Sequence, residues 1–334
     1  MQLTQVVPRL GPWDGVGDYA SRLGEVLQRR HGVTSRFIEA GNAGGRRELM
    51  EALAAPQGPL LLHYVGYGYA RRGAPLWLAR AIARRNRGRR LGVVFHELFA
   101  TGRPWQSAFW LSGLQQHVVT RLARQCDGAL LTREANREWL EATGALAGKR
   151  VSVLPISSNV GEPVELPPLT ARPARLVVWN SAAARATAYG ARWERVRAAC
   201  RQLGVTELVD IGPPVELPRE PDLPIEPRGR LEAATLSEVL LGARFGLVVY
   251  PASFLAKSSI FAALAAHGVA PIVLDEQRTP DMDGLVAGQT HLALEQVTAA
   301  VPEDIARGAR RWYAGHDTAA HADAVARLFE GAGA

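Results

Sequence analysis

The chain contains 334 residues, of which 47% are hydrophobic, and its mean hydropathy is −0.05. This length predicts two domains of about 150 residues each, and no apolar run approaches the ~20 residues of a membrane span. The net charge is +7, and there are only two cysteines, Cys126 and Cys200, which excludes a disulfide framework and a zinc site built on cysteine pairs. Because the start of the chain lacks a signal-peptide pattern, a cytoplasmic protein is expected.

Short apolar runs alternate with amphipathic segments through the first half of the chain. The predicted strands are Met1–Val7, Thr34–Glu39, Pro59–Tyr64, Leu91–Phe95, Gly128–Thr132 and Val151–Pro155. The predicted helices are Asp18–His31, Arg46–Ala54, Leu76–Arg87, Leu111–Cys126 and Glu134–Thr143. Such alternation is typical of a parallel sheet with right-handed crossovers.

A proline-rich stretch without periodicity, residues 156–173, predicts a linker, after which the alternation restarts. The second set of strands is Leu176–Asn180, Glu207–Ile211, Phe245–Tyr250 and Val269–Leu274. The helices are Arg192–Leu203, Leu236–Gly242, Ser258–His267, Glu303–Ala314 and Thr318–Phe329. We therefore predict an α/β protein with two doubly wound Rossmann-like domains, 1–158 and 174–305, facing across a cleft. Residues 306–334 are expected to pack back toward the first domain.

The segment Gly15-Val16-Gly17-Asp18 lies between the first strand and the first helix. Glycines let a backbone approach a ligand closely, and a helix N-terminus attracts phosphate. We therefore predict that Gly15, Gly17 and Asp18 bind a phosphate-containing donor. The alternative is an ordinary tight strand–helix turn capped by Asp18.

Two strand ends carry histidine, as His63-Tyr64 and His96-Glu97. A histidine there can bond a sugar hydroxyl or transfer a proton, and the neighbouring carboxylate can act as a base. The spacing does not fit zinc. A structural role in the core is the competing interpretation for each histidine.

Aromatic, amide and cationic residues crowd the stretch 102–110, which suits stacking on sugar rings and bonding to their hydroxyls. The acceptor-binding candidates are His63, Tyr64, Arg103, Trp105 and Gln106. An aromatic packing loop under the following helix is equally consistent with this composition.

The loop Tyr250–Ser259 carries Lys257, one of only two lysines in an arginine-rich chain. A lysine supplies a compact charge to a diphosphate, while Ser258 and Ser259 would cap the next helix and bind the same phosphates. An ordinary capped helix with a surface lysine is the alternative. Asn180 and Arg185, after the first strand of the second half, are weaker candidates for the same ligand.

Several segments resemble the GT-B glycosyltransferases, most closely the large family four of retaining enzymes, also called glycosyltransferase group 1. These segments are GVGDYASRLGEVL, PWQSAFWLSGLQ, LTREANREWL and YPASFLAKSSIFAALAAHGVAPIV. The resemblance implies a bacterial-type enzyme of polysaccharide biosynthesis, whose first half holds the acceptor and whose second half holds a UDP- or GDP-sugar.

The same resemblance implies a metal-independent mechanism with no further cofactor. Lys257 and the helix start at Ser258 would stabilise the leaving diphosphate, and the Gly15 loop would approach the donor. His96 would touch the transferred sugar, with Glu97 as its partner.

Family four often carries two glutamates eight residues apart, but this chain has Leu255 and Ala263 at those positions. A non-catalytic glycosyltransferase-like binding or scaffold protein is therefore the alternative function. A nicotinamide-dependent oxidoreductase ranks last: Glu39 lies about 20 residues beyond the glycine pair, but the third glycine of its fingerprint is absent.

Charge is unevenly distributed, with 22 Lys and Arg against 11 Asp and Glu in residues 1–160, and 17 against 21 in the rest. This asymmetry predicts an anionic partner for the first half. No nucleic-acid module is evident, so an anionic inner-membrane face or a lipid-linked or anionic glycan acceptor is favoured. The expected contact is the arginine cluster at 84, 85, 87, 89 and 90, although a merely solvated surface is the alternative.

Overall fold

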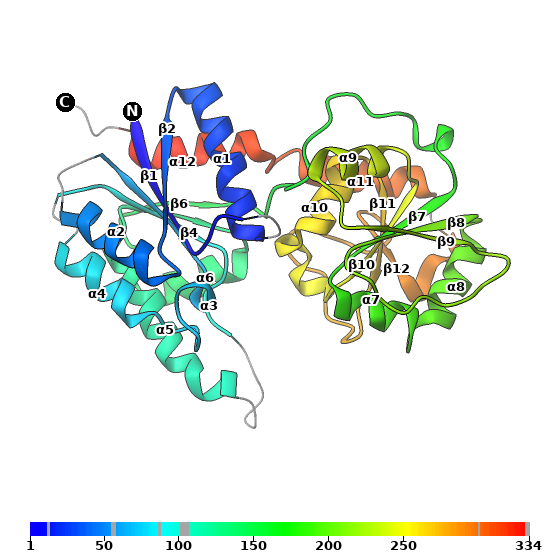
Figure 1. Cartoon of the computed structure of the whole chain (residues 1–334), viewed down its shortest axis with the longest axis horizontal. Helices are drawn as coiled ribbons and strands as arrows, with labels where there is room; N and C mark the ends of the chain where they lie inside the picture. The colour runs from blue at the N-terminus through cyan, green and yellow to red at the C-terminus, as the bar shows by residue number, and fades with distance from the viewer. Residues whose placement is uncertain (12–13, 55–57, 86–87, 101–106, 300, 331–334) are drawn as a thin grey trace. The chain divides into compact units, whose positions relative to one another are not determined.

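The computed structural model describes residues 1–11, 14–54, 58–85, 88–100, 107–299 and 301–330. The chain forms two compact units, each built on its own sheet (Figure 1). The first unit comprises Met1–Pro155 and the chain from Thr318 onward, and the second comprises Ile156–Asp317.

The first unit contains a six-stranded parallel sheet in the order β2-β1-β3-β4-β5-β6. Its strands are β1 (Gln2–Val7), β2 (Thr34–Glu39), β3 (Leu60–Tyr64), β4 (Leu91–Phe95), β5 (Gly128–Leu131) and β6 (Arg150–Val153). Its helices are α1 (Gly15–His31), α2 (Ala43–Ala54), α3 (Gly66–Tyr69), α4 (Leu76–Arg85), α5 (Ser107–Gln125), α6 (Glu134–Ala142) and α12 (Thr318–Phe329). The central strands are buried on both faces, which explains why they are continuous apolar runs.

The second unit contains another six-stranded parallel sheet, in the order β12-β11-β10-β7-β8-β9. Its strands are β7 (Arg175–Trp179), β8 (Glu207–Ile211), β9 (Ile225–Gly229), β10 (Phe245–Val249), β11 (Ala270–Leu274) and β12 (Leu292–Ala293). Its helices are α7 (Ala182–Tyr189), α8 (Trp193–Gln202), α9 (Ala233–Leu241), α10 (Ser259–Ala266), α11 (Pro302–Tyr313) and the 3-10 turns η1 (Leu169–Ala171), η2 (Ala252–Lys257) and η3 (Leu294–Ala299). Two Rossmann-like units were predicted from the sequence, and the sheets confirm them.

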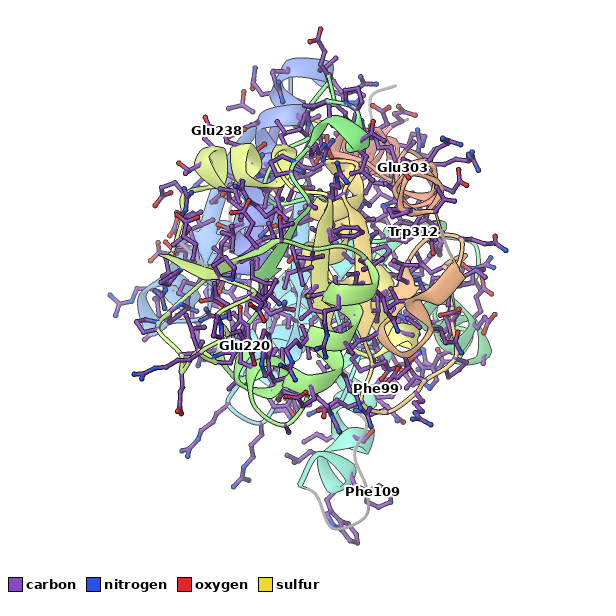
Figure 2. The ribbon with its side chains drawn as sticks, turned by 90° about the vertical axis from the view of Figure 1, so that its right-hand side faces the viewer. Phe99, Phe109, Glu220, Glu238, Glu303 and Trp312 are labelled. Atoms are coloured by element: carbon purple, nitrogen blue, oxygen red, sulfur yellow. The ribbon has the colours of Figure 1, made fainter. Side chains whose placement is uncertain are left out.

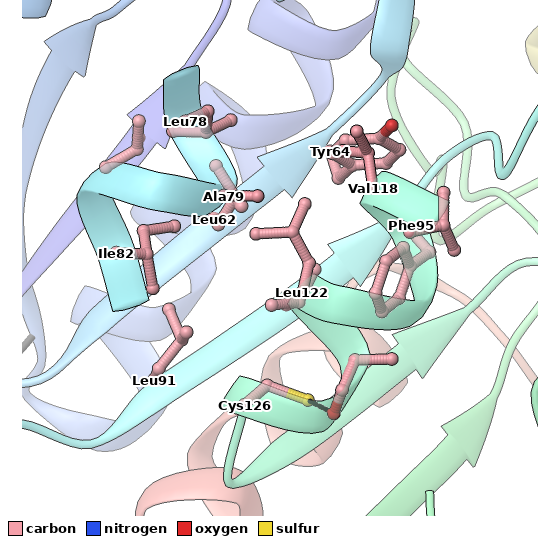
Figure 3. Close-up of a cluster of buried hydrophobic side chains, with 14 of the residues drawn as sticks. Leu62, Tyr64, Leu78, Ala79, Ile82, Leu91, Phe95, Val118, Leu122 and Cys126 are labelled. Atoms are coloured by element: carbon pink, nitrogen blue, oxygen red, sulfur yellow. Dashed lines mark hydrogen bonds between the residues drawn. The ribbon is translucent and has the colours of Figure 1, made fainter. Parts of the chain in front are cut away.

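The core of the first unit lies between the sheet and helices α2, α4 and α5. Figure 3 shows Leu78, Ala79 and Ile82 of α4 and Val118 and Leu122 of α5 packed over Leu62, Tyr64, Leu91 and Phe95. Burial of each such leucine stabilises the fold by roughly 1.5–3 kcal/mol. None of the helices in the described part of the chain is both long and apolar enough to cross a lipid bilayer.

Helix α12 returns to the first unit and packs beside α1, on the sheet face opposite α4 and α5. A Cβ atom at Gly92 would lie 2.9 Å from the Phe329 ring, and one at Gly128 would lie 2.7 Å from Leu328, so these glycines make room for α12. Helix α11 differs from the expectation for residues 306–334: it packs on α10 and β11 in the second unit.

The proline-rich stretch 156–173 also differs from a free linker, because it packs on the second unit. Leu169 is part of that unit's core, and the backbone N–H of Ser158 donates to the Tyr313 hydroxyl at 2.8 Å. Buried Arg172 donates to the carbonyl oxygens of Pro167 and Ala243. Apart from the single 3-10 turn η1, this segment is held by individual side-chain contacts with the second unit.

Candidate functional site

Each sheet has one point at which the order of its strands reverses direction. In the first sheet this point lies between β1 and β3, and in the second it lies between β7 and β10. Ligands of open α/β sheets bind outside the carboxyl ends of the strands at such a point. The loops that follow these four strands are therefore the candidate ligand-binding segments.

The loop after β1 enters α1 through Gly15 and Gly17. The helix begins at Gly15, and its N-cap is Asp14 rather than Asp18: Oδ1 of Asp14 accepts the backbone N–H of Gly17 at 2.9 Å. A Cβ atom at position 17 would lie 2.6 Å from the carbonyl oxygen of Arg9, so only glycine fits there. Among the residues that the structure describes, none would contact a Cβ at Gly15, and Asp18 is half-buried in the first turn. Packing against these residues thus explains Gly17 but not Gly15.

Beneath this loop, buried polar side chains gather at the carboxyl ends of the strands. His63 is the last residue but one of β3 and is fully buried, and His96 follows β4 with 7% of its surface exposed. Their rings stack with centroids 5.5 Å apart, and the Tyr19 ring of α1 lies edge-on to His96 at 5.0 Å. Gln5 from β1 and His321 from α12 complete the cluster. Four separate chain segments and the returning helix therefore meet at the predicted histidines.

The hydrogen bonds of this cluster determine its proton positions. The Gln5 amide donates Nε2–H to the Ser35 hydroxyl at 2.7 Å, so its Oε1 accepts Nε2–H of His63, also at 2.7 Å. Burial lowers the pKa of His63 to about 3, so its ring is neutral and Nδ1 is an acceptor. His96 must then donate Nε2–H to Nδ1 of His63, at 3.3 Å. This chain of bonds places a proton on Nε2 of His96.

Tyr19 links the histidines to the returning helix. Burial raises the pKa of its hydroxyl, so the hydroxyl stays protonated and donates to Nδ1 of His321 at 2.7 Å. The other nitrogen of His321 donates to the carbonyl oxygen of Pro155 at 2.9 Å. Helix α12 thereby fixes the ring that covers His96.

The low pKa of His63 predicts a pH-dependent stability. Between its ordinary pKa of 6.5 and about 3, the unfolded chain binds a proton that the folded protein does not, so stability is lost as the pH falls. From pH 7 to pH 5 the loss should be ~2 kcal/mol. The free energy of unfolding is measured with denaturant at pH 7 and at pH 5. In His63→Gln the difference between the two values should be smaller than in the wild type by ~2 kcal/mol. The control is His117→Gln, which changes an exposed histidine of α5. An equal pH dependence in the wild type and both variants would contradict the assignment.

The remaining first-unit candidates lie in different surroundings. Tyr64 is fully buried in the core with its ring against Phe95, on the sheet face opposite His63. Packing in the core therefore accounts for a tyrosine at this position. Tyr64 could contact an acceptor directly only if the core opened. Glu97 is exposed directly after His96. Three further acceptor candidates lie outside the described residues: Arg103, Trp105 and Gln106.

In the second unit, η2 connects β10 to α10 and carries Lys257 at its last position. Lys257 is half-buried, and its Nζ lies 5.7 Å from the centroid of the Phe254 ring. Ser258 is the N-cap of α10, because its Oγ accepts the backbone N–H of Phe261 at 3.2 Å, as the sequence predicted. Ser259 is the first helical residue and is half-buried. A lysine therefore stands immediately before a capped helix N-terminus at the switch point of this sheet.

Asp275, directly after β11, holds the η2 loop in place. Its Oδ2 accepts the backbone N–H groups of Ala252 and Thr279 and the Thr279 hydroxyl, and the Thr279 Oγ1 accepts the N–H of Ser253. Burial raises the pKa of Asp275, but the bonds from Thr279, Ala252 and Gln277 outweigh burial and leave the pKa below its usual value. The loop with Lys257 is thus anchored by a carboxylate from the neighbouring strand.

Beside Asp275 the second unit has a charged hollow of about 150 Å³. It is lined by Arg192, Arg195, Leu274, Asp275, Glu276, Arg278 and Glu295. Arg192 pairs with Glu276 at 3.0 Å, whereas Arg278 has a φ of +50°, a conformation that costs energy for a residue other than glycine. Because ligand pockets usually measure 300 Å³ or more, this hollow has room for only part of a nucleotide-sugar.

Two residues that were predicted to bind the donor, Asn180 and Arg185, have partners within the second unit. Asn180 donates to the carbonyl oxygen of Leu247 at 2.7 Å and accepts the N–H of Val249 at 3.1 Å, so it joins β7 to β10. Arg185 is fully buried and pairs with Asp210 at 2.6 Å. Both side chains are buried, with 7% of Asn180 and none of Arg185 exposed.

The structure also identifies residues that the sequence did not single out: Gln5, Tyr19 and His321 around the histidines, and Asp275, Arg192, Arg195 and Arg278 near η2. Of these, only Asp275 carried a signal, since it directly follows a buried strand. The two positions where family four often has glutamate, Leu255 and Ala263, are fully buried and packed in the core of the second unit.

Comparison with known proteins bears on the fold. No protein-family model matches the sequence, and no curated protein matches it either. An α-glucosyltransferase in complex with UDP-glucose and DNA containing an abasic site matches with a TM-score of 0.57 at 9% identity, over 99% of this chain and 100% of that chain. WaaG, a glycosyltransferase involved in lipopolysaccharide biosynthesis, matches with a TM-score of 0.56 at 11% identity, over 98% and 100%. The chain has the GT-B fold.

A protein described by a different activity is also similar in structure. A putative UDP-N-acetylglucosamine 2-epimerase from Listeria monocytogenes matches with a TM-score of 0.57 at 13% identity, over 96% of this chain and 94% of that chain. At such identities the likeness establishes the arrangement of helices and strands, and the chemistry must be argued from the residues.

Proposed function

We propose that this GT-B protein is a glycosyltransferase that moves a sugar from a nucleotide-diphosphate sugar to an acceptor. The observation that carries the proposal is the lysine before the capped start of α10, at the switch point of the second sheet. The similar structures support a nucleotide-sugar as the ligand, since one holds UDP-glucose and another holds UDP. A UDP-sugar is therefore our first choice of donor and a GDP-sugar the second.

In this proposal the second unit stabilises the leaving diphosphate. As the bond between the sugar and the phosphate breaks, negative charge gathers on the phosphate oxygens. The ammonium of Lys257 and the backbone N–H groups at the start of α10 supply positive charge there. We propose that this charge serves in place of a metal ion.

His96 is our candidate for contact with the transferred sugar, and Glu97 is its less certain partner. The bond from His96 to His63 holds the ring in one orientation and one tautomer. A ring fixed in this way can hold a hydroxyl group without losing rotamer freedom on binding. We keep Gly15 as the backbone approach to the donor, because no described residue lies within 4 Å of a Cβ built there.

The acceptor is proposed to be a glycan, a lipid-linked glycan or a small molecule, in bacterial polysaccharide biosynthesis. Residues 1–155 and 318–334 carry 23 Lys and Arg against 13 Asp and Glu, a net charge of +10. Such a charge favours an anionic acceptor or a peripheral position at an anionic membrane.

The donor is tested by a thermal-shift panel of UDP, GDP, ADP and dTDP with their sugars. A nucleotide that binds the folded protein at 100 times its Kd adds about 2.7 kcal/mol of stability, or roughly 5–10 °C in Tm for a unit of this size. We expect UDP to give the largest shift. No shift with any nucleotide would contradict the proposed donor site.

Turnover then separates transfer from the alternatives. A glycosyltransferase releases UDP faster when a suitable acceptor is added, whereas an epimerase changes the sugar of the donor without any acceptor. Nucleotide binding with neither transfer nor donor hydrolysis would favour the scaffold alternative.

A further inference from the structure

Exposed apolar side chains concentrate at the start of α5. Phe109, Trp110 and Leu114 expose 44%, 75% and 41% of their surfaces, and the two aromatic rings contact each other edge-to-face at 5.5 Å. Figure 2 shows Phe109 at the end of this helix, pointing away from the sheet that the helix covers. A pair of aromatic rings held in solvent is costly unless something covers them.

The exposed side of α5 changes from apolar to basic along the helix. Residues 110, 114, 117, 121 and 124 recur every three or four positions, and they are tryptophan, leucine, histidine and two arginines. All five are exposed or half-exposed, whereas Val118 and Leu122 on the other side are buried against the core. We call these five residues, together with Phe109, the α5 face. It contains no acidic residue.

The neighbourhood of the α5 face is also basic. Buried Gln115 donates Nε2–H to the carbonyl oxygen of Arg72 at 3.0 Å and to the Tyr67 hydroxyl at 3.3 Å. This links the helix to the exposed segment that holds Arg71 and Arg72. Exposed aromatic rings flanked by arginines match the boundary between the acyl chains and the phosphates of a bilayer.

The arginine cluster at 84–90 is less suited to that contact. Arg89 donates to the carbonyl oxygens of Gly58 and Ala52, and Arg90 donates to that of Glu330 at 3.0 Å. Two of its guanidinium groups therefore hold neighbouring parts of the first unit together.

We propose that the α5 face binds the surface of an anionic phospholipid bilayer. Phe109, Trp110 and Leu114 enter the headgroup boundary, and Arg121 and Arg124 contact lipid phosphates. Arg124 also donates to the carbonyl oxygen of Thr143, but at 3.5 Å this exposed bond is long and is exchanged for a phosphate on binding. The apolar area consists of only three side chains, which is small for a stable protein partner but sufficient for interfacial anchoring when combined with basic residues. This inference does not depend on the proposed sugar transfer.

The test is co-sedimentation of the full chain with phosphatidylcholine vesicles, with and without phosphatidylglycerol, at low and high salt. We expect binding only to the anionic vesicles, weakened by salt. Removing two arginines in Arg121→Gln/Arg124→Gln should weaken partitioning about 30-fold, and Phe109→Ala/Trp110→Ala should weaken it about tenfold or more. The matched control is Val164→Ala, which changes a 96% exposed residue of the second unit.

A second measurement reports insertion directly. Both native cysteines are free and buried, so a single Leu114→Cys can carry an environment-sensitive dye. Its emission should shift to the blue with anionic vesicles, while the same dye at Val164→Cys should not respond. The proposal is overturned if vesicles do not bind, if the α5 variants bind as the wild type does, or if these variants change only self-association measured without lipid.

Discussion

Replacing Lys257 by alanine is expected to weaken UDP binding by roughly 10- to 100-fold, as measured by isothermal titration. A charge-assisted hydrogen bond to phosphate contributes about 1.5–3 kcal/mol, and the loss of that contribution sets this range. If sugar transfer is observed, kcat/KM should fall further, by about 10²–10³, because the diphosphate carries more charge in the transition state.

Two controls make this result specific. Lys257→Arg keeps the charge and should retain part of the affinity, although a guanidinium does not reproduce a compact ammonium. Arg311→Ala removes an exposed cation from α11 in the same unit and should leave UDP binding unchanged. Equal UDP affinity in wild type and Lys257→Ala, with both proteins folded by circular dichroism, would remove the diphosphate site from this loop.

Replacing Arg185 by methionine should destabilise the second unit by roughly 3–5 kcal/mol. Arg185 is completely buried and pairs with Asp210, whose other oxygen accepts the Tyr189 hydroxyl at 2.8 Å. The variant leaves the Asp210 carboxylate buried without its cation. Hydrogen exchange followed by mass spectrometry should therefore show faster exchange in peptides from β7 and β8.

Two further variants test whether the unpaired Asp210 carboxylate causes the loss of stability. Arg185→Met/Asp210→Asn removes the stranded charge but keeps an acceptor for Tyr189, so it should recover much of the stability. Arg175→Met breaks the more exposed pair with Glu207, which joins β7 to β8, at an expected cost of 1 kcal/mol or less. If Arg185→Met exchanges like Arg175→Met, the buried pair is not what stabilises this region.

Leu91–Phe95 and Glu207–Ile211 were predicted with the bounds that the structure has, and both strands are almost entirely buried. Inner strands of a parallel sheet read as apolar runs because helices cover both faces of the sheet. Thr34–Glu39 was predicted with its bounds too, although it is an edge strand in which Ile38 is the one buried residue. Another edge strand, β9 (Ile225–Gly229), was missed, since it is mostly exposed and contains Pro227. The short, alanine-rich α7 was missed because eight residues give little periodic signal.

The candidate site was predicted in part. Strand ends drew attention to His63, His96 and the loop before α10, because the carboxyl edge of a parallel sheet is where ligands bind. The sequence ranked Lys257 above Arg185 as a phosphate ligand but kept both, since both are cations in loops or helices after a strand. Only the fold shows that Arg185 is enclosed with Asp210, whereas Lys257 lies half-buried beside a helix start.

By itself the sequence determined the two Rossmann-like sheets, the strand ends that carry polar residues and the basic character of the first half. The tertiary structure decided which side chains meet. Tyr19 and His321 are separated by 302 positions and form one hydrogen bond, and the proton positions of His63 and His96 follow from Gln5 on another strand. The physical reason is that periodicity reports which side of an element is buried. The partner that buries it depends on how distant segments of the chain pack together.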